Sequence, residues 1–223
     1  MATTASHTQG TRAGRGRRAP RAASGEEREQ AILQTAERLL QRRSLAEVSV
    51  DDLAQGAGIS RPAFYFYFPS KDAVVLTLID RVVEEVARLR QGAVDKLAEN
   101  PRAAWREGIE SYYATFGAHR PVIRAVNELG ATNAEARELW SSVMGGWVAQ
   151  IAGLIEAERE RGAAPDGGPA RDLATALVQM NERVLHAIFL GEAPTVEETQ
   201  VIDTLTHIWL SSIYGESSSA SSR

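Results

Sequence analysis

The 223-residue chain contains no cysteine, so it offers no disulfide framework, no thiolate nucleophile and no cysteine-based metal site. Long hydrophobic runs are also missing, and none approaches the roughly 20 apolar residues that a membrane helix requires. The N-terminus carries arginines with no apolar segment after them, which is not the pattern of a secretory signal. These absences predict a cytoplasmic protein without a membrane partner.

The sequence signatures of enzymes are missing as well. There is no GxSxG nucleophile elbow and no Walker loop, and the segment Gly56-Ala57-Gly58 lacks the third glycine of a dinucleotide-binding loop. No pair of carboxylates stands in an apolar setting. The four histidines lack the spacing of metal ligands: His7, His119, His186 and His207. We therefore expect a protein that is not an enzyme, with no catalytic residues, metal or cofactor.

The net charge of −4 argues by itself against a nucleic-acid binder, but its distribution reverses that argument. Residues 1–24 carry five arginines and no acid, so the rest of the chain has 20 basic against 29 acidic residues, or −9. A basic arm on an acidic body indicates local contact with DNA. We predict a disordered arm over residues 1–24 that lies along DNA, and a merely solvated tail is the alternative.

The stretch SVDDLAQGAGISRPAFYFYFPSK, residues 49–71, has the pattern of a helix, a tight turn and a second helix. Ser49 is a good N-cap, and two aspartates follow it in the first turn, where acids favour the positive helix end. Gly56 and Gly58 are then expected to break the helix, as a sharp turn requires. Ser60 caps the next helix, with Pro62 in its first turn.

Five aromatic residues in a row, Phe64 to Phe68, follow in this second helix. One helix face can bury Phe64 and Phe68, so Tyr65 and Tyr67 must point elsewhere. Exposed tyrosines beside Arg61 need a partner surface, and a helix-turn-helix in the DNA major groove supplies one. The alternative is an αα-hairpin whose aromatic plug binds another protein.

Helical patterns occupy the rest of the chain, and we find no strand and no internal repeat, which predicts an all-α fold. Ser24 and Glu27 form a capping box before the first helix, and a long amphipathic helix runs from Lys71 to Leu97. Later helices are expected to begin near Pro101, Pro121, Asn133, Pro169 and Thr195, the last through a capping box with Glu198 and with an end at Gly215.

All four tryptophans lie beyond the predicted helix-turn-helix. Trp140 and Trp147 are seven residues apart and share a helix face with Met144, while Tyr112 and Phe116 share a face with Trp105. Rings from several helices could line an apolar ligand pocket. Plain core packing is the alternative, and composition alone favours it.

The predicted helix-turn-helix resembles the DNA-binding segment of the TetR family of bacterial transcriptional repressors, through Leu53-Ala54, Ala57-Gly58-Ile59-Ser60, Tyr65, Phe68 and Lys71. The run SRPAFYFYFPSK, the four tryptophans and the closing HIWLSSIYGES resemble one mycobacterial member of that family, from about Glu26 to Glu216. The resemblance implies a homodimer on palindromic operator DNA, with one or several dimers per operator. It also implies nucleoid association and repression of a neighbouring monooxygenase gene.

The resemblance further implies which residues carry each function. The implied DNA contacts are Ser49, Ser60, Arg61, Pro62, Ala63, Tyr65, Tyr67 and Lys71. A channel for a lipophilic effector would be lined by Trp105, Tyr112, Phe116, Trp140, Met144, Trp147, Asn181 and Trp209, with Asn181 as its polar anchor. His186 is either a further ligand contact or a hydrogen-bonded core histidine. Filling this channel, for example by Gly145→Trp, is expected to mimic the ligand and weaken DNA binding.

The implied domains are a helix-turn-helix DNA-binding domain over residues 25–70 and a larger helical ligand-binding and dimerisation domain over residues 71–215. A low-complexity tail over residues 216–223 follows. The expected function is therefore a ligand-responsive transcriptional repressor. The alternative is a DNA-binding regulator whose aromatic core is plain packing and has no physiological ligand.

Overall fold

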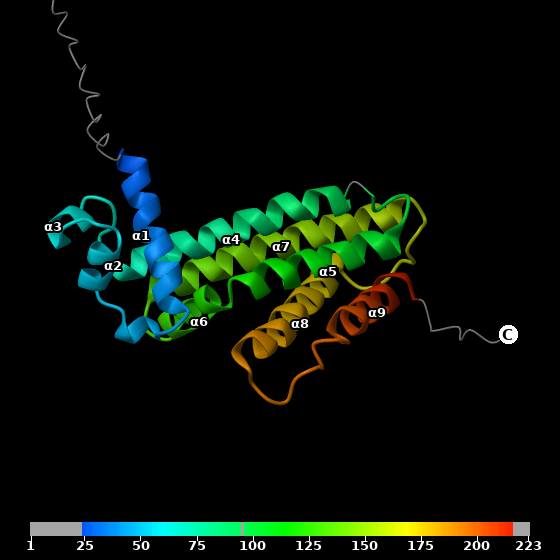
Figure 1. Cartoon of the computed structure of the whole chain (residues 1–223). Helices are drawn as coiled ribbons and strands as arrows, with labels where there is room; N and C mark the ends of the chain where they lie inside the picture. Colours follow the sequence, from blue (N-terminus) through cyan, green and yellow to red (C-terminus); the bar gives the residue numbers. More distant parts are fainter. Residues whose placement is uncertain (1–23, 95, 216–223) are drawn as a thin grey trace, which may run out of the picture.

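The computed structural model describes residues 24–94 and 96–215, and its regular elements within these ranges are all helices (Figure 1). The all-α prediction is confirmed. The predicted tail and the predicted arm, apart from Ser24, lie outside the described residues. The elements are α1 Gly25–Leu40, the 3-10 helix η1 Leu45–Glu47, α2 Val50–Gly56, α3 Arg61–Phe64, α4 Lys71–Val94, α5 Pro101–Ala118, α6 Arg120–Gly130, α7 Ala134–Glu160, α8 Ala170–Leu190 and α9 Val201–Tyr214.

Serine caps begin the helices at the N-terminal end as the sequence predicts. The Ser24 hydroxyl accepts from the backbone N–H of Glu27, and the Glu27 carboxylate accepts from the backbone N–H of Ser24. The hydroxyls of Ser49 and Ser60 likewise accept from backbone N–H groups three residues later. These local bonds satisfy helix-end donors that would otherwise lack partners.

The aromatic run is only partly helical. Helix α3 ends at Phe64, so the rest of the predicted second helix is a turn that leads to α4. Phe64 and Phe68 are buried as expected, and their ring centroids lie 6.1 Å apart. Tyr65 and Phe66 are 47% and 87% exposed. Pro69 disfavours the helical conformation in the residue before it, Phe68, which agrees with a helix that ends before this proline.

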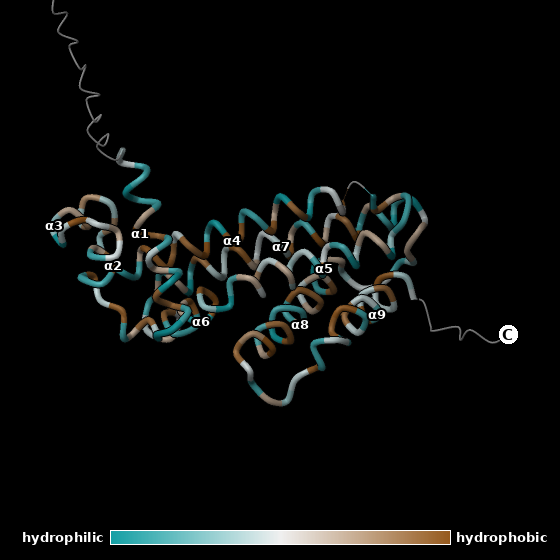
Figure 2. Tube along the Cα trace, in the orientation of Figure 1, coloured by the Kyte–Doolittle hydropathy of each residue, from teal (hydrophilic) through white to brown (hydrophobic). Residues whose placement is uncertain are grey.

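Helix α4 connects the two ends of the molecule (Figure 1). It begins beside the α1–α3 end, packs on α1, α5 and α6, and runs along the whole body. Its inner face is apolar and its outer face hydrophilic (Figure 2). The helix ends at Val94, three residues before the predicted Leu97. Its 24 residues make it about 36 Å long at roughly 1.5 Å per residue.

Helices α5 to α9 form the body, in which α7 packs on α8 and α5 packs on α9. Left-handed glycines follow and end α8 and α9, Gly191 with φ 70° and Gly215 with φ 68°, and the end at Gly215 was predicted. No helix in the described ranges combines the length and apolarity that a membrane span needs.

The predicted start of the last helix is wrong. Helix α9 begins at Val201, and Thr195 and Glu198 form no capping box. The Glu198 carboxylate instead accepts hydrogen bonds from the Tyr113 hydroxyl at 3.3 Å and from Arg120 at 3.1 Å. These partners lie 85 and 78 residues away in the sequence, so long-range contacts hold the carboxylate away from the backbone that it was predicted to cap.

Candidate DNA-binding surface and ligand cavity

The turn between α2 and α3 depends on two glycines for different reasons. Gly58 has φ 69°, which is a left-handed conformation that favours glycine. Gly56 belongs to α2, and a Cβ atom built on it would lie 2.3 Å from Cγ2 of Thr35 in α1. Gly56 therefore allows α2 to approach α1 closely, a role that the sequence pattern does not reveal.

The tip of α3 presents polar and aromatic groups outward. Arg61 donates to Oδ2 of Asp51 at 2.5 Å and to the Tyr65 hydroxyl at 3.4 Å. The Arg61 and Asp51 side chains are 54% and 62% exposed, so water screens this ion pair and a DNA phosphate can compete for the guanidinium. Of the residues implied to contact DNA, five are exposed: Ser49, Ser60, Arg61, Pro62 and Tyr65.

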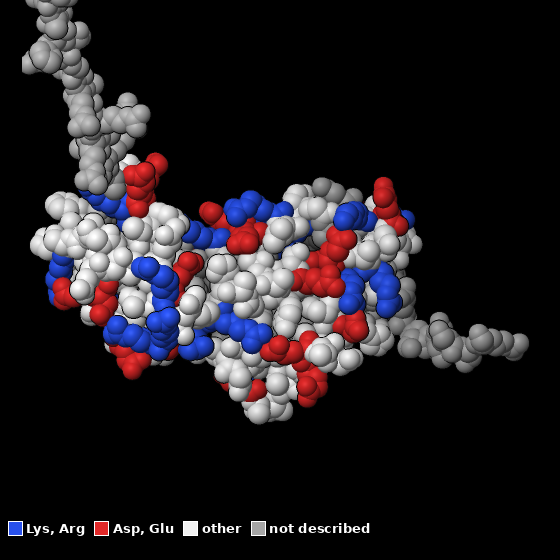
Figure 3. Space-filling model, in the orientation of Figure 1, with Lys and Arg blue, Asp and Glu red and all other residues white. Residues whose placement is uncertain are grey.

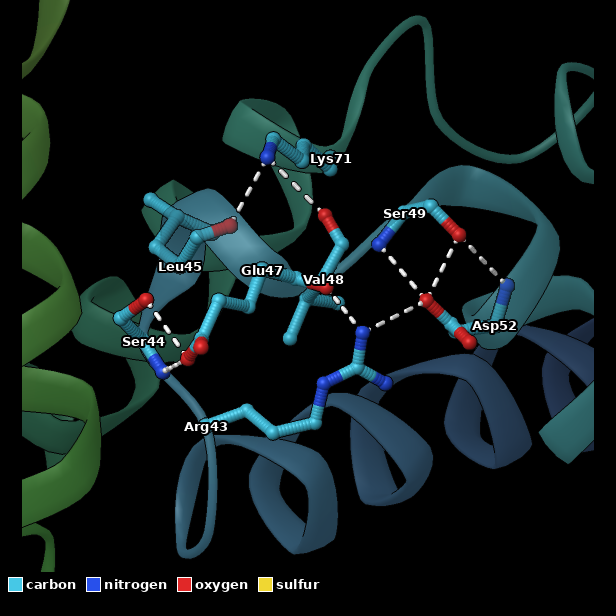
Figure 4. A network of polar contacts seen from close by, with 8 residues as sticks. All are labelled: Arg43, Ser44, Leu45, Glu47, Val48, Ser49, Asp52 and Lys71. Carbon is cyan, nitrogen blue, oxygen red and sulfur yellow. Dashed lines mark hydrogen bonds and ion pairs between the residues drawn. The ribbon is translucent and has the colours of Figure 1, made fainter.

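The remaining three, Ala63, Tyr67 and Lys71, are half-buried. The Lys71 ammonium donates to the carbonyl oxygens of Leu45 at 2.8 Å and Val48 at 2.9 Å (Figure 4). It thereby ties the start of α4 to η1. Because an ammonium has three donors, one is left for another partner.

Two capping boxes stand in series beside this lysine (Figure 4). Ser44 and Glu47 form one at η1, and Ser49 and Asp52 form the other at α2. Arg43 joins them, since its guanidinium donates to the backbone oxygen of Glu47 and, at 3.1 Å, to Oδ2 of Asp52. The hydrogen bond from the Ser49 hydroxyl and then that from Arg43 hold the pKa of Asp52 well below its usual range. These hydrogen bonds hold η1 and α2 in a fixed arrangement even when no DNA is bound.

Basic side chains gather over the lower part of α1, η1 and α6, with acidic side chains among them, while the surface over α2 and α3 is mostly uncharged (Figure 3). The body shows a mixed distribution on the same face (Figure 3). Local positive charge at this end is suited to phosphate contacts, although the whole chain is acidic.

A cavity lies in the body between α4, α5, α7, α8 and α9. It contains about 630 Å³ of empty space, including the open space at its mouth. Five of the residues that were expected to line a channel do line it: Trp105, Tyr112, Trp147, Asn181 and Trp209. Its mainly apolar wall with a few polar groups is typical of a small-molecule site.

The other expected lining residues do not reach this cavity. The buried Phe116 stacks on Tyr112 with ring centroids 4.3 Å apart and touches Trp140 and Trp147 edge-on. Trp140 and His186 line a second hollow among α4, α6, α7 and α8, and Met144 packs half-buried against the core without lining either space. The aromatic block of Tyr112, Phe116, Trp140 and Trp147 thus separates two spaces where one channel was expected.

The indole groups of the cavity are held by polar partners. The Trp209 N–H donates to Oδ1 of Asn181 at 2.9 Å, and the Trp105 N–H donates to the Tyr214 hydroxyl at 2.9 Å. Tyr214 in turn donates to the buried carboxylate of Glu158 at 2.8 Å. Burial and then the hydrogen bond to Glu158 raise the pKa of the Tyr214 phenol, while the Trp105 bond acts in the opposite direction.

The glycine that was expected to offer a way to fill the cavity, Gly145, lies outside it, and a different glycine, Gly108, lines it. Gly145 is exposed on α7 and is not among the lining residues, so Gly145→Trp would add a ring to the surface. Gly108 on α5 does line the cavity, and apart from its chain neighbours and the backbone of its own helix no atom lies within 4 Å of where its Cβ would stand. A large side chain at Gly108 therefore has the space that was expected at Gly145.

Sequence reasoning also missed Arg90, which lines the cavity from α4. A signal was available, because Arg90 stands four residues after the buried Val86 and four before the lining Val94, on one stripe of the helix.

Within the described ranges, no group of three or more histidine and acidic side chains could hold a metal ion.

Two families match the chain. Residues 32–78 match "Bacterial regulatory proteins, tetR family", and residues 105–215 match "Transcriptional regulator EthR, C-terminal domain". The chain is 57% identical to the HTH-type transcriptional regulator EthR of Mycobacterium tuberculosis (strain ATCC 25618 / H37Rv) over 207 residues, which are 91% of this chain and 94% of that protein. It is 53% identical to EthR of Mycolicibacterium smegmatis over 213 residues, 96% of each chain.

Solved structures at low identity share the fold. The fatty acid degradation regulator FadR from Bacillus halodurans aligns with TM-score 0.65 and 17% identity, over 82% of this chain and 94% of that one. Thermus thermophilus FadR, a TetR family repressor in complex with lauroyl-CoA, aligns with TM-score 0.60 and 18% identity, over 87% and 100%. These likenesses concern the fold alone.

Proposed function

Because the chain belongs to the EthR-type branch of the TetR family of transcriptional regulators, we propose that it is a ligand-responsive repressor that binds palindromic operator DNA as a homodimer. Residues 25–70 are the DNA-binding unit of this proposal, and residues 71–215 bind the ligand and form the dimer. The observation that carries it is the course of α4, which begins at the Lys71 contacts with η1 and ends in the wall of the aromatic cavity.

The DNA-binding unit reads the operator through the tip of α3. Arg61 reaches base edges or phosphate, and Pro62 and Ala63 make apolar contacts such as those with thymine methyl groups. Tyr65, Tyr67 and Lys71 fix the register on phosphates, as do Ser49 and Ser60. The exposure of Arg61, Pro62 and Tyr65 supports these roles.

A single short recognition helix reads too few bases for specificity. A two-fold dimer presents two such helices to half-sites about 34–36 Å apart. Helices α8 and α9 are the proposed interface, because they lie together on one side of the body and leave apolar side chains half-buried in the single chain (Figure 1). These side chains include Met180, Val184, Leu190 and Ile208.

The switch is a shift in population between two arrangements of the dimer. A lipophilic molecule that fits the cavity only when α4 tilts favours the arrangement whose DNA-binding units no longer match the operator spacing. Its effect cannot exceed its difference in affinity for the two states, typically about 1–3 kcal/mol of coupling. The proposed target is a neighbouring monooxygenase gene, controlled from the intergenic DNA upstream by one or several dimers.

Fluorescence anisotropy across a salt series tests this proposal. The protein should bind its own upstream intergenic DNA far more tightly than a scrambled duplex, with a log–log salt slope of about −0.9 for each phosphate neutralised. Lipophilic compounds that enter the cavity should then release the upstream DNA. If the protein shows no preference for that fragment at any salt concentration, repression from this site is excluded and an interaction role is favoured. Specific binding that no compound reverses would support the alternative that the aromatic residues are plain packing.

A further inference from the structure

The cavity wall contains a cation, Arg90, that has no polar partner within the described part of the chain. Arg90 lies one helical turn before the end of α4, and its guanidinium makes no hydrogen bond or ion pair with any residue in the described ranges. Removal from water lowers its pKa, and the nearby Tyr112 phenol opposes that shift. An arginine stays charged in proteins, so the cavity carries a positive charge that forms no ion pair within the described ranges.

The other polar groups of the wall can also donate hydrogen bonds. An indole can only donate, so the Asn181 atom that faces Trp209 must be its oxygen, which leaves the amide nitrogen for the cavity. The Tyr112 hydroxyl has no hydrogen-bond partner among the described residues, and it interacts electrostatically with Glu182 and, less strongly, with Arg90. Arg90, Tyr112 and Asn181 therefore present a cation and donor groups to a bound molecule, which must supply acceptors.

The placement of Arg90 inverts the usual pattern of an amphipathic helix. Its neighbour Leu89 is 52% exposed, while Arg90 turns into an apolar space. An arginine near the end of a helix can favour the helix dipole by contacting the last carbonyl groups. No such hydrogen bond is formed by Arg90 in the described residues, so its position is not explained by capping.

We propose that the cavity binds an amphipathic carboxylate, whose anionic head is held by Arg90 and whose hydrocarbon tail lies against Trp105, Trp147 and Trp209. A guanidinium matches a carboxylate through two parallel hydrogen bonds, and apolar aromatic walls accept the tail. This inference rests on the proposed function, because it names the class of effector for the same cavity.

The test compares an acid with its neutral ester. Dodecanoate and methyl dodecanoate are titrated near neutral pH, below micelle-forming concentrations, while the intrinsic fluorescence of the cavity tryptophans reports binding. The ratio of the two affinities measures the contribution of the anionic head. We expect Arg90→Met to reduce the preference for the acid by about 10- to 100-fold, the range for a charge-assisted hydrogen bond. Arg90→Lys should keep most of the preference.

Arg88→Met is the matched control, because Arg88 is exposed on the same helix and does not line the cavity. It should leave the affinity ratio unchanged. Circular dichroism and binding to the upstream DNA verify that each variant folds, and Arg90→Gln takes the place of Arg90→Met if that variant does not.

Two outcomes overturn the inference in distinguishable ways. If both compounds bind and release DNA from the wild type and from Arg90→Met with the same affinity ratio, Arg90 has no role in recognition but ligand control stands. If neither compound binds while specific DNA binding is intact, both this inference and the ligand control in the proposed function fail.

Discussion

The indole N–H of Trp209 donates to the amide oxygen of Asn181 at 2.9 Å, and both side chains are buried in the cavity wall. The bond joins α8 to α9 and orients a large ring of the cavity. It also decides what Asn181 offers to a ligand, because the acceptor of the amide already has an internal partner. The predicted polar anchor is therefore mainly a donor.

Replacing only one partner of this hydrogen bond should destabilise the protein. Asn181→Leu leaves the Trp209 N–H buried without an acceptor, and we expect the free energy of unfolding to fall by about 1–3 kcal/mol. Trp209→Phe added to Asn181→Leu removes the orphaned donor, so the double variant should lose less than the sum of the single variants. Urea denaturation measures all three. Additive losses would show that the bond contributes no coupling, and Asn127→Leu, at an exposed site, is the control.

Lys71 should stabilise the DNA-binding unit even when no DNA is present. Lys71→Met removes two charge-assisted hydrogen bonds to the carbonyls of Leu45 and Val48, which should cost about 1.5–3 kcal/mol of stability. Lys96→Met is a matched control, because Lys96 forms an exposed ion pair with Glu107 and should cost at most about 1 kcal/mol. Thermal unfolding without DNA measures both variants. Equal losses of stability in Lys71→Met and Lys96→Met would show that the Lys71 contacts do not stabilise the protein.

The same lysine variant tests the predicted phosphate contact separately. A direct contact would lower the magnitude of the salt slope of DNA binding by about one unit when Lys71 is replaced. A loss of DNA affinity with an unchanged slope would instead assign the effect to the geometry that Lys71 holds. Anisotropy titrations at several salt concentrations separate the two.

Gly56→Ala should destabilise the protein, although alanine normally favours a helix by about 1 kcal/mol over glycine. The new methyl group would lie 2.3 Å from Cγ2 of the buried Thr35, and overpacking of this kind costs about 1–3 kcal/mol. Thr35→Ser removes that methyl group but keeps the hydroxyl that accepts from Arg38, so it should rescue Gly56→Ala.

Gly153→Ala provides the reference for this pair, since Gly153 is exposed in α7 and its Cβ would meet nothing within 4 Å. This variant should be neutral or slightly more stable than the wild type. Equal melting temperatures for Gly56→Ala and Gly153→Ala would contradict the close approach of α1 and α2.

Filling the cavity should mimic a ligand. In Gly108→Trp the indole would occupy the space beside Tyr112 and Trp147, and DNA affinity should fall by about 5- to 150-fold, the range of typical allosteric coupling. Gly145→Trp places the same ring on the exposed side of α7 and should leave DNA affinity unchanged. A folded, dimeric Gly108→Trp protein with wild-type affinity would count against coupling between the cavity and the DNA-binding unit.

The helix ends show what a few neighbouring residues can specify. The hydroxyls of Ser24, Ser49 and Ser60 bond to backbone groups three residues away, and the glycines after α8 and α9 adopt the conformation that ends a helix. Such interactions close within one helical turn, so the sequence specifies them before any tertiary contact forms. The helical fold and the helix-turn-helix followed from these patterns and from the resemblance to TetR-type repressors.

The sequence by itself therefore determined the helical class and most helix boundaries, and the resemblance added five residues of the cavity wall. The tertiary structure decided which distant groups meet. Glu198 accepts hydrogen bonds from Tyr113 and Arg120 and does not form its expected helix cap. Lys71 donates to the carbonyl oxygens of Val48 and Leu45, 23 and 26 residues earlier in the chain. The physical reason is that a charged group takes whichever partner the packed chain brings closest. By the same packing, Arg90 faces an apolar cavity in which no described protein group neutralises it.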